Sequence, residues 1–207
     1  MYLSLLKLDL TLLTTRRLLL DSYLLHQAIC RAFPDSSCGG RGRVLYRLDV
    51  DTESRTANVL VQSQIQPAWE KAELLHTCLK EPPRTKPFNP VVAKGQKLYF
   101  RLRANPTIRR DGKRLGILRE EDQIRWLNRK AAASGFTVLS CQVICEGIQK
   151  STRPKDDTAQ PLSFLSVRFD GVLCVEDPLL FVQCLESGIG SGKSMGFGLL
   201  SVAPLKE

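Results

Sequence analysis

Tyr23 and His26 stand three positions apart in a segment where Asp21 or Ser22 is expected to cap a helix. Side chains with this spacing are neighbours on a helix, so a phenol and an imidazole are expected side by side. Histidine is the usual acid or base near neutral pH, and such a pair facing a groove could move protons. The alternative is a surface histidine beside a boundary tyrosine. His76, in a second predicted helix, is interpreted as structural.

Cationic side chains are concentrated between residues 101 and 119, a stretch that contains a single acid, Asp111. The cations are Arg101, Arg103, Arg109, Arg110, Lys113, Arg114 and Arg119. This density suits the neutralisation of phosphates with release of counterions. Tyr99, Arg101 and Arg103 share one face of a predicted strand, on which a base could stack. The stretch favours contact with RNA or DNA over the alternative, a solvated loop.

Two smaller basic clusters are predicted to contact the same polymer. Lys150, Arg153 and Lys155 lie in a predicted loop between two strands. Arg41 and Arg43 follow a group of glycines and open a predicted strand. All these sites together predict a nucleic-acid-binding surface.

Five glycines fall within residues 188–198, where they let the backbone turn sharply and aim N–H groups at an anion. The sequence Gly192-Lys-Ser194 invites comparison with a nucleotide-binding P-loop, but that motif requires glycine where this chain has Ser187. No nucleotide cofactor is therefore expected. The loop is instead predicted to hold the backbone of a polynucleotide, through Gly188, Gly190, Lys193, Ser194 and Gly196. The alternative is a simple connection into the last strand.

Composition limits the class of protein. The chain has 207 residues, of which 43% are hydrophobic and 25% charged, as in a folded globular protein. Its formal net charge of +9 suggests an anionic partner. Charged residues interrupt the leucine-rich start, and no apolar stretch approaches the roughly 18 residues of a membrane span, so neither a membrane partner nor a signal peptide is expected.

The cysteines and acids indicate neither a metal site nor a disulfide framework. Seven cysteines occur without a C-x-x-C pair, which favours reduced thiols and a cytoplasmic location. The acidic residues are scattered, and no metal-binding motif is present. No metal and no other cofactor are predicted.

The apolar pattern predicts an α+β fold of two tandem ferredoxin-like (βαββαβ, RRM-like) domains. Residues 1–90 form the first domain, with the helix of Tyr23, and residues 91–207 form the second, with the basic and glycine-rich loops. In the first domain we expect strands at 2–9, 44–50 and 57–65 and helices at 21–33 and 69–79. In the second we expect strands at 97–103, 136–147, 163–175 and 197–202 and helices at 120–134 and 177–186. The proline-rich segment 81–90 is interpreted as a linker.

Several motifs stand in the order found in one known family. They are Met1-Tyr-Leu-Ser, Tyr23-Leu-Leu-His26, Tyr99-Phe-Arg-Leu-Arg-Ala-Asn-Pro106, Gly171-Val-Leu, the glycine loop from Gly188 to Ser201, and Ala203-Pro-Leu205. Through these motifs the chain resembles, over essentially its whole length, the CasE family of CRISPR-associated endoribonucleases of type I-E systems. The Arg-Leu-Arg-Ala-Asn-Pro block and the glycine loop are the specific elements.

The resemblance implies a tandem ferredoxin-like fold and an RNase that cuts CRISPR precursor RNA at the 3′ base of each repeat hairpin. It implies metal-independent cleavage that leaves a 2′,3′-cyclic phosphate and a 5′-hydroxyl. It also implies that the protein stays on the guide RNA with the other subunits of the Cascade complex. Tyr23 and His26 match the catalytic pair, the terminal glycine loop matches one that lies against RNA, and the loop of Lys150 matches by position only.

The chemistry of RNA gives these residues roles. A 2′-hydroxyl already lies beside its phosphorus, so the enzyme must align it, take its proton and protonate the leaving 5′ oxygen. We assign His26 to proton transfer, while Tyr23 either orients the 2′-hydroxyl or shares the proton work. Lys193 and Ser194 could stabilise charge on the phosphorane. The alternative function is a non-catalytic RNA-binding module of the same fold.

Overall fold

The computed structural model describes residues 1–34, 42–155 and 158–205, without the side chains of residues 153–161. Arg41 and the side chains of Arg153 and Lys155 therefore lie outside the described part of the chain. The chain divides into two compact units. Unit 1 consists of Met1–Asn89, Lys150–Leu162 and Ser194–Gly196, and unit 2 of Pro90–Gln149, Ser163–Lys193 and Phe197–Glu207. The predicted domain boundary at residue 90 stays a prediction.

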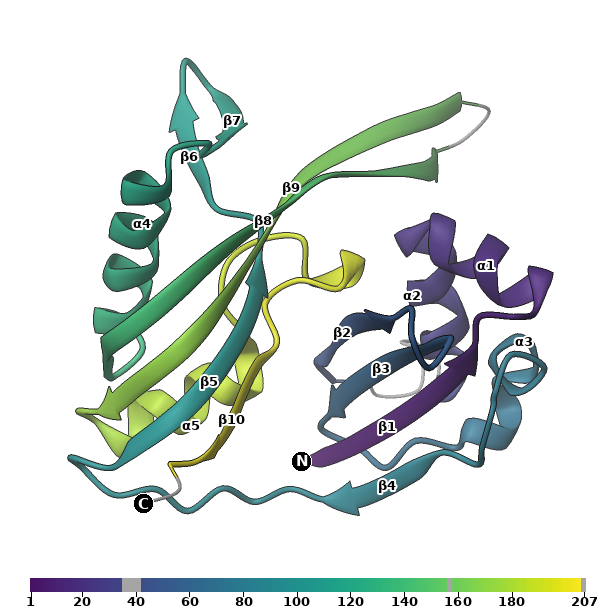
Figure 1. The fold of residues 1–207 in the computed structure, drawn as a ribbon, viewed down its shortest axis with the longest axis horizontal. Helices are drawn as coiled ribbons and strands as arrows, with labels where there is room; N and C mark the ends of the chain where they lie inside the picture. The colour runs from purple at the N-terminus through teal and green to yellow at the C-terminus, as the bar shows by residue number, and fades with distance from the viewer. Residues whose placement is uncertain (35–41, 156–157, 206–207) are drawn as a thin grey trace. The chain divides into compact units, whose positions relative to one another are not determined.

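Unit 1 is built on a four-stranded antiparallel sheet with the order β2-β3-β1-β4 (Figure 1). Its strands are β1 (Tyr2–Asp9), β2 (Val44–Asp51), β3 (Thr56–Ser63) and β4 (Arg84–Pro87). Its helices are α1 (Leu13–Leu20), α2 (Ser22–Cys30) and α3 (Glu73–His76), preceded by the 3₁₀ turn η2 (Trp69–Lys71). Alternating residues such as Leu6 on β1 and Val59 on β3 point into one core, which Leu25 and Ile29 of α2 complete.

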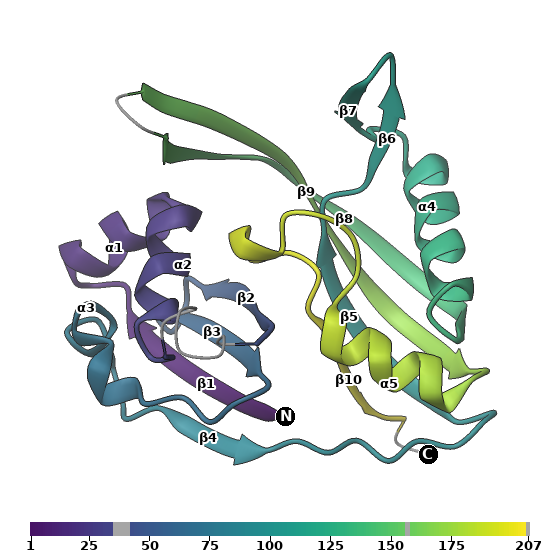
Figure 2. The ribbon, with the colours of Figure 1, turned by 180° about the vertical axis from the view of Figure 1, so that it is seen from behind.

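Unit 2 repeats this plan in a sheet with the order β10-β5-β9-β8 (Figure 2). Its strands are β5 (Lys97–Ala104), β8 (Phe136–Lys155), β9 (Thr158–Val175) and β10 (Leu200–Pro204). The end of β8 from Lys150 and the start of β9 up to Leu162 belong to unit 1. The helices of unit 2 are α4 (Glu120–Ala132) and α5 (Pro178–Ser187), and the 3₁₀ turn η3 (Lys193–Met195) begins in unit 2 and ends in unit 1. A separate hairpin is formed by β6 (Thr107–Arg110) and β7 (Lys113–Gly116). Both helices pack on the core of the sheet through side chains such as Trp126 and Phe181.

Each unit has the strand order of a βαββαβ fold, with the first strand between the third and the fourth. The predicted α+β class and its two ferredoxin-like domains are therefore confirmed. Within the described residues, no helix is long and apolar enough to cross a membrane.

Three predicted elements are wrong. Segment 81–90 is not a plain linker, because it contains β4, an edge strand on which proline is tolerated. The helix expected at 69–79 is split into η2 and the four-residue α3. The cluster of Lys150 lies in β8, not in a loop, because β8 and β9 both continue far beyond their predicted ends.

Candidate functional site

The helix that carries Tyr23 and His26 is capped by Asp21, one of the two predicted cap residues. The Asp21 side chain accepts a hydrogen bond from the Tyr23 N–H over 2.9 Å, which satisfies an amide that the helix itself leaves unpaired. The Ser151 hydroxyl donates to the same Asp21 oxygen over 2.5 Å, and the Tyr23 N–H lies 3.2 Å from the Ser151 oxygen. A segment far away in the sequence thus fixes the first turn of α2.

Tyr23 and His26 are half-buried, whereas their neighbours Leu25 and Ile29 are buried in the core. The imidazole ring of His26 stacks on the Tyr46 ring, with centroids 6.3 Å apart and planes 18° apart. The Cys30 sulfur lies 3.6 Å from His26 Nε2 and 3.8 Å from Nδ1. The predicted pair therefore lies at the surface edge of α2, with the imidazole supported by two further side chains.

The hairpin of β6 and β7 presents four exposed cations, at residues 109, 110, 113 and 114. Its turn is Asp111-Gly112, and both residues have positive φ values, 49° and 72°. An Asp-Gly pair of this kind is a strong signal for a two-residue hairpin, although no hairpin was predicted here. No acid in the described part of the chain forms an ion pair with any of the four cations.

The hairpin places its like charges directly opposite one another. Arg109 is the cross-strand partner of Arg114, and Arg110 is that of Lys113. Opposed like charges destabilise a strand pair, so this arrangement does not serve the stability of the hairpin. It does provide a dense cationic surface for an anion.

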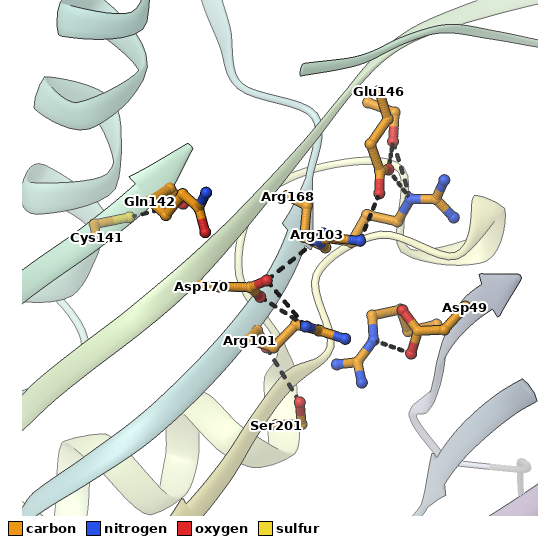
Figure 3. A network of polar contacts seen from close by, with 11 residues as sticks. Asp49, Arg101, Arg103, Cys141, Gln142, Glu146, Arg168, Asp170 and Ser201 are labelled. Atoms are coloured by element: carbon orange, nitrogen blue, oxygen red, sulfur yellow. Dashed lines mark hydrogen bonds and ion pairs between the residues drawn. The ribbon is translucent and has the colours of Figure 1, made fainter. Parts of the chain in front are cut away.

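Arg101 and Arg103 share one face of β5 with the exposed Tyr99, as predicted, but both are ion-paired within unit 2. Arg101 binds Asp170 through two hydrogen bonds of 2.7 and 3.0 Å. Arg103 donates to Glu146 over 2.5 Å (Figure 3). Arg168 of β9 also pairs with both acids, at 3.2 Å from Asp170 and 3.8 Å from Glu146, so three guanidinium groups share two carboxylates. The charge of Arg101 and Arg103 is therefore partly offset, in contrast to the charge of the hairpin.

The glycine loop combines a left-handed backbone with close packing. Gly188, Gly190 and Gly196 have φ values of 74°, 81° and 83°, a region that other residues rarely adopt. A β-carbon at position 190 would lie 3.1 Å from the Trp126 ring. Lys193 donates to the Ser187 carbonyl over 2.7 Å. Lys193 belongs to unit 2 and Ser194 to unit 1, so these adjacent residues have different structural surroundings.

A cavity of about 450 Å³ adjoins the unit 2 part of this loop. Four cations line it, Arg114 of β7, Arg129 and Lys130 of α4, and Lys193, together with residues 188–191. No acidic residue is among its lining residues in the described part of the chain. The charge of this lining is suited to anions such as the phosphate groups of a polynucleotide.

Of the other predicted RNA-binding cations, two have described side chains, and both are exposed. Arg43 and Lys150 are exposed side chains of unit 1.

Among the residues whose placement is described, no group of three or more His, Cys, Asp or Glu side chains could hold a metal ion. Six described cysteines are free thiols, and burial raises the pKa of the Cys141 thiol to about 11, which keeps it protonated.

Comparisons with known proteins agree over nearly the whole chain. A family profile described as "CRISPR associated protein" matches residues 1–204. The CRISPR-associated endoribonuclease Cse3 of Thermus thermophilus is 34% identical over 199 residues, which cover 91% of this chain and 93% of that protein. The CRISPR system Cascade subunit CasE of Escherichia coli K12 is 32% identical over 200 residues, which cover 89% of this chain and 93% of that protein.

A solved structure gives the same result at the level of the fold. A CRISPR endoribonuclease Cse3 bound to a 19-nucleotide RNA is similar with a TM-score of 0.86 and 35% identity. The similarity covers 99% of this chain and 100% of that one.

Proposed function

The chain belongs to this family of CRISPR-associated proteins, as an endoribonuclease that processes RNA, and we propose that it cuts CRISPR repeat transcripts by 2′-hydroxyl attack. The observation that carries the proposal is the half-buried Tyr23–His26 pair on α2. In this reaction the 2′ oxygen forms a bond to phosphorus while the bond to the 5′ oxygen breaks. The products are a 2′,3′-cyclic phosphate and a 5′-hydroxyl, and no metal-activated water is needed.

His26 transfers the proton in this proposal, and Tyr23 aligns the 2′-hydroxyl or shares that transfer. The 2′-hydroxyl loses a proton as it attacks, and the leaving 5′ oxygen gains one, so the step needs a base and an acid. An imidazole near neutral pH can act as either. The cap formed by Asp21 and Ser151 holds the first turn of α2, and with it the backbone of Tyr23, in a fixed position.

The basic hairpin of β6 and β7 binds the phosphate backbone of the RNA. Its support is the set of four exposed, mutually opposed cations, at residues 109, 110, 113 and 114, which lack ion pairs among the described residues. The cationic cavity beside residues 188–191 takes a further phosphate, with Lys193 in its lining. Arg43 and Lys150, which are exposed on unit 1, add positive charge for the RNA. Arg101 and Arg103 contribute more weakly, because Asp170 and Glu146 offset part of their charge.

The protein remains with its product RNA and with the other subunits of a Cascade complex. This part of the proposal follows from the E. coli relative, which is named as a Cascade subunit, and from the solved relative bound to RNA. A repeat that folds as a hairpin is the expected RNA. The cytoplasmic location stays a prediction.

Product analysis tests this function and separates it from the alternative, an RNA-binding module without catalysis. The protein is incubated with a labelled repeat hairpin in EDTA, and the product ends are identified. We expect cleavage to a cyclic phosphate and a 5′-hydroxyl, and no cleavage when the sugar 5′ of the cut site is a deoxyribose. An intact RNA would support the binding module, and cleavage of the deoxy substrate at the normal rate would exclude 2′-hydroxyl attack.

A further inference from the structure

Tyr46 lies on β2, directly beneath the proposed catalytic helix. Its side chain is only 1% exposed, although it carries a hydroxyl. A buried tyrosine hydroxyl needs a hydrogen-bond partner, and the position of that partner shows which segments the side chain connects. Both of its carbonyl partners belong to segments that carry predicted site residues, α2 and the glycine loop.

The Tyr46 hydroxyl joins α2 to the glycine loop. It lies 3.0 Å from the Ser22 carbonyl, at the first residue of α2, and 3.3 Å from the Ser194 carbonyl. One donor thus serves two segments that are distant in sequence and that both belong to unit 1. Neither carbonyl belongs to the strand of Tyr46, so the contacts fix how these segments lie on the sheet.

The aromatic ring of Tyr46 forms two further contacts. One face stacks on His26, with nearly parallel planes. The ring edge also lies against the loop, because a β-carbon at position 196 would be only 2.9 Å from Tyr46 Cε2. Gly196 is therefore needed for close packing on Tyr46 as well as for its positive φ of 83°.

We propose that Tyr46 is a positioning residue that holds the His26 imidazole and the Ser194–Gly196 segment in their reactive arrangement. This inference rests on the proposed function. The ring limits the orientations of the imidazole, and the hydroxyl ties the start of α2 to the loop. Because proton transfer depends steeply on geometry, loss of these contacts lowers the rate of cleavage more than the affinity for RNA.

Two substitutions separate the ring from the hydroxyl. Tyr46→Phe keeps the stacked ring, and Tyr46→Leu removes it. We expect the single-turnover cleavage rate at saturating RNA to fall roughly threefold in Tyr46→Phe and more than about tenfold in Tyr46→Leu. The dissociation constant for the uncleavable deoxy substrate should change by less than about twofold. Tyr2→Phe, at a tyrosine on β1 with no assigned role, is the matched control and keeps the full rate.

An NMR measurement without RNA provides a signal that a general loss of stability would not produce. The chain has only two histidines, so the imidazole resonances of His26 can be followed with those of His76 as an internal reference. We expect the His26 resonances to move in Tyr46→Leu and those of His76 to stay in place. All rates are measured well below the melting midpoint of each variant.

The possible outcomes distinguish this inference from the proposed function. Folded variants that cleave at the wild-type rate would overturn the positioning role, and so would slow cleavage with unmoved His26 resonances. A wild-type protein that leaves RNA intact would refute the proposed function instead, whatever the resonances show. A shift of the His26 resonances in Tyr46→Leu, together with slow cleavage at unchanged affinity for RNA, supports the inference.

Discussion

The first crossover in each unit runs between equivalent strands, yet the two crossovers carry different chemistry. In unit 1 the chain passes from β1 to β2 through α1 and α2 and presents Tyr23 and His26. In unit 2 it passes from β5 to β8 through the β6–β7 hairpin and α4 and presents four exposed cations. One crossover provides groups that can move protons, and the other provides cations that suit phosphates.

The difference shows that the strand order determines where a crossover lies, but does not determine which helices, hairpins or exposed side chains it contains. Both sheets bury similar apolar residues, and both cores are closed by helices. The exposed positions of a crossover are free to vary because they contribute little to the core, as on the half-buried edge of α2 and on the β6–β7 hairpin. A duplicated βαββαβ plan can therefore separate catalysis from binding, and three changes test that separation.

Replacing the imidazole of unit 1 should have the largest effect. We expect His26→Ala to lower the single-turnover cleavage rate at least tenfold, because general acid or base groups contribute about 10²–10⁴-fold to such rates. The affinity for the deoxy substrate should stay nearly unchanged. His76→Ala serves as the control because His76 lies on the separate helix α3. A large loss of affinity with an intact rate would place His26 in binding instead.

Neutralising the hairpin of unit 2 should produce the opposite pattern. The variant carries Gln at residues 109, 110, 113 and 114. We expect its dissociation constant to rise roughly tenfold or more at moderate salt, because phosphate contacts and their released counterions are lost. The slope of log affinity against log salt should fall by about one for each cation that contacts a phosphate. The rate at saturating RNA should change little.

A matched control removes the same charge elsewhere. Its four exposed targets, all outside the proposed site, are Arg17, Lys71, Lys86 and Lys94. Equal loss of affinity in both variants would show that net charge, not the hairpin, governs binding. Loss of the saturated rate only in the hairpin variant would show that unit 2 also takes part in catalysis.

The smallest expected effect compares the Asp caps of two helices. Asp21 caps α2, and Asp177 caps α5 by accepting from the N–H groups of Leu179 and Leu180. Replacement of either by Ala should cost about 1 kcal/mol of unfolding free energy, or about 2–4 °C in the melting midpoint. Only Asp21→Ala should also slow cleavage, by a few-fold, because only α2 carries the proposed catalytic pair. Equal rates in the two variants would contradict the role of the α2 cap.

Much of the fold could be predicted because local patterns agreed with the final packing. The strand at 2–9, the hairpin of β2 and β3, and the Asp-capped α2 all appear close to their predicted positions. Helix α1 was not predicted because its cap residue, Leu12, makes no side-chain hydrogen bond and leucines occupy its exposed face as well. Strand β4 was missed because prolines hide an edge strand, although they do not prevent it.

The site was predictable only in part. The adjacency of Tyr23 and His26 follows from helical spacing, and the Asp111-Gly112 turn was a local signal for the basic hairpin that the sequence analysis passed over. The contacts of Tyr46, Ser151 and Gly196 had no local signal. Each of these residues meets its partner across more than a hundred positions of sequence in at least one contact.

The sequence by itself determined the two sheets, the helix that carries the phenol and imidazole, and the excess of cations, because these depend on spacing and composition. The tertiary structure decided which cations form ion pairs, as Arg101 does with Asp170, and which remain exposed on a hairpin. It also decided what supports His26. Such contacts form only when distant strands and loops come together. The free energy of packing depends on residues that are far apart in the sequence, whereas local propensity depends on sequence neighbours.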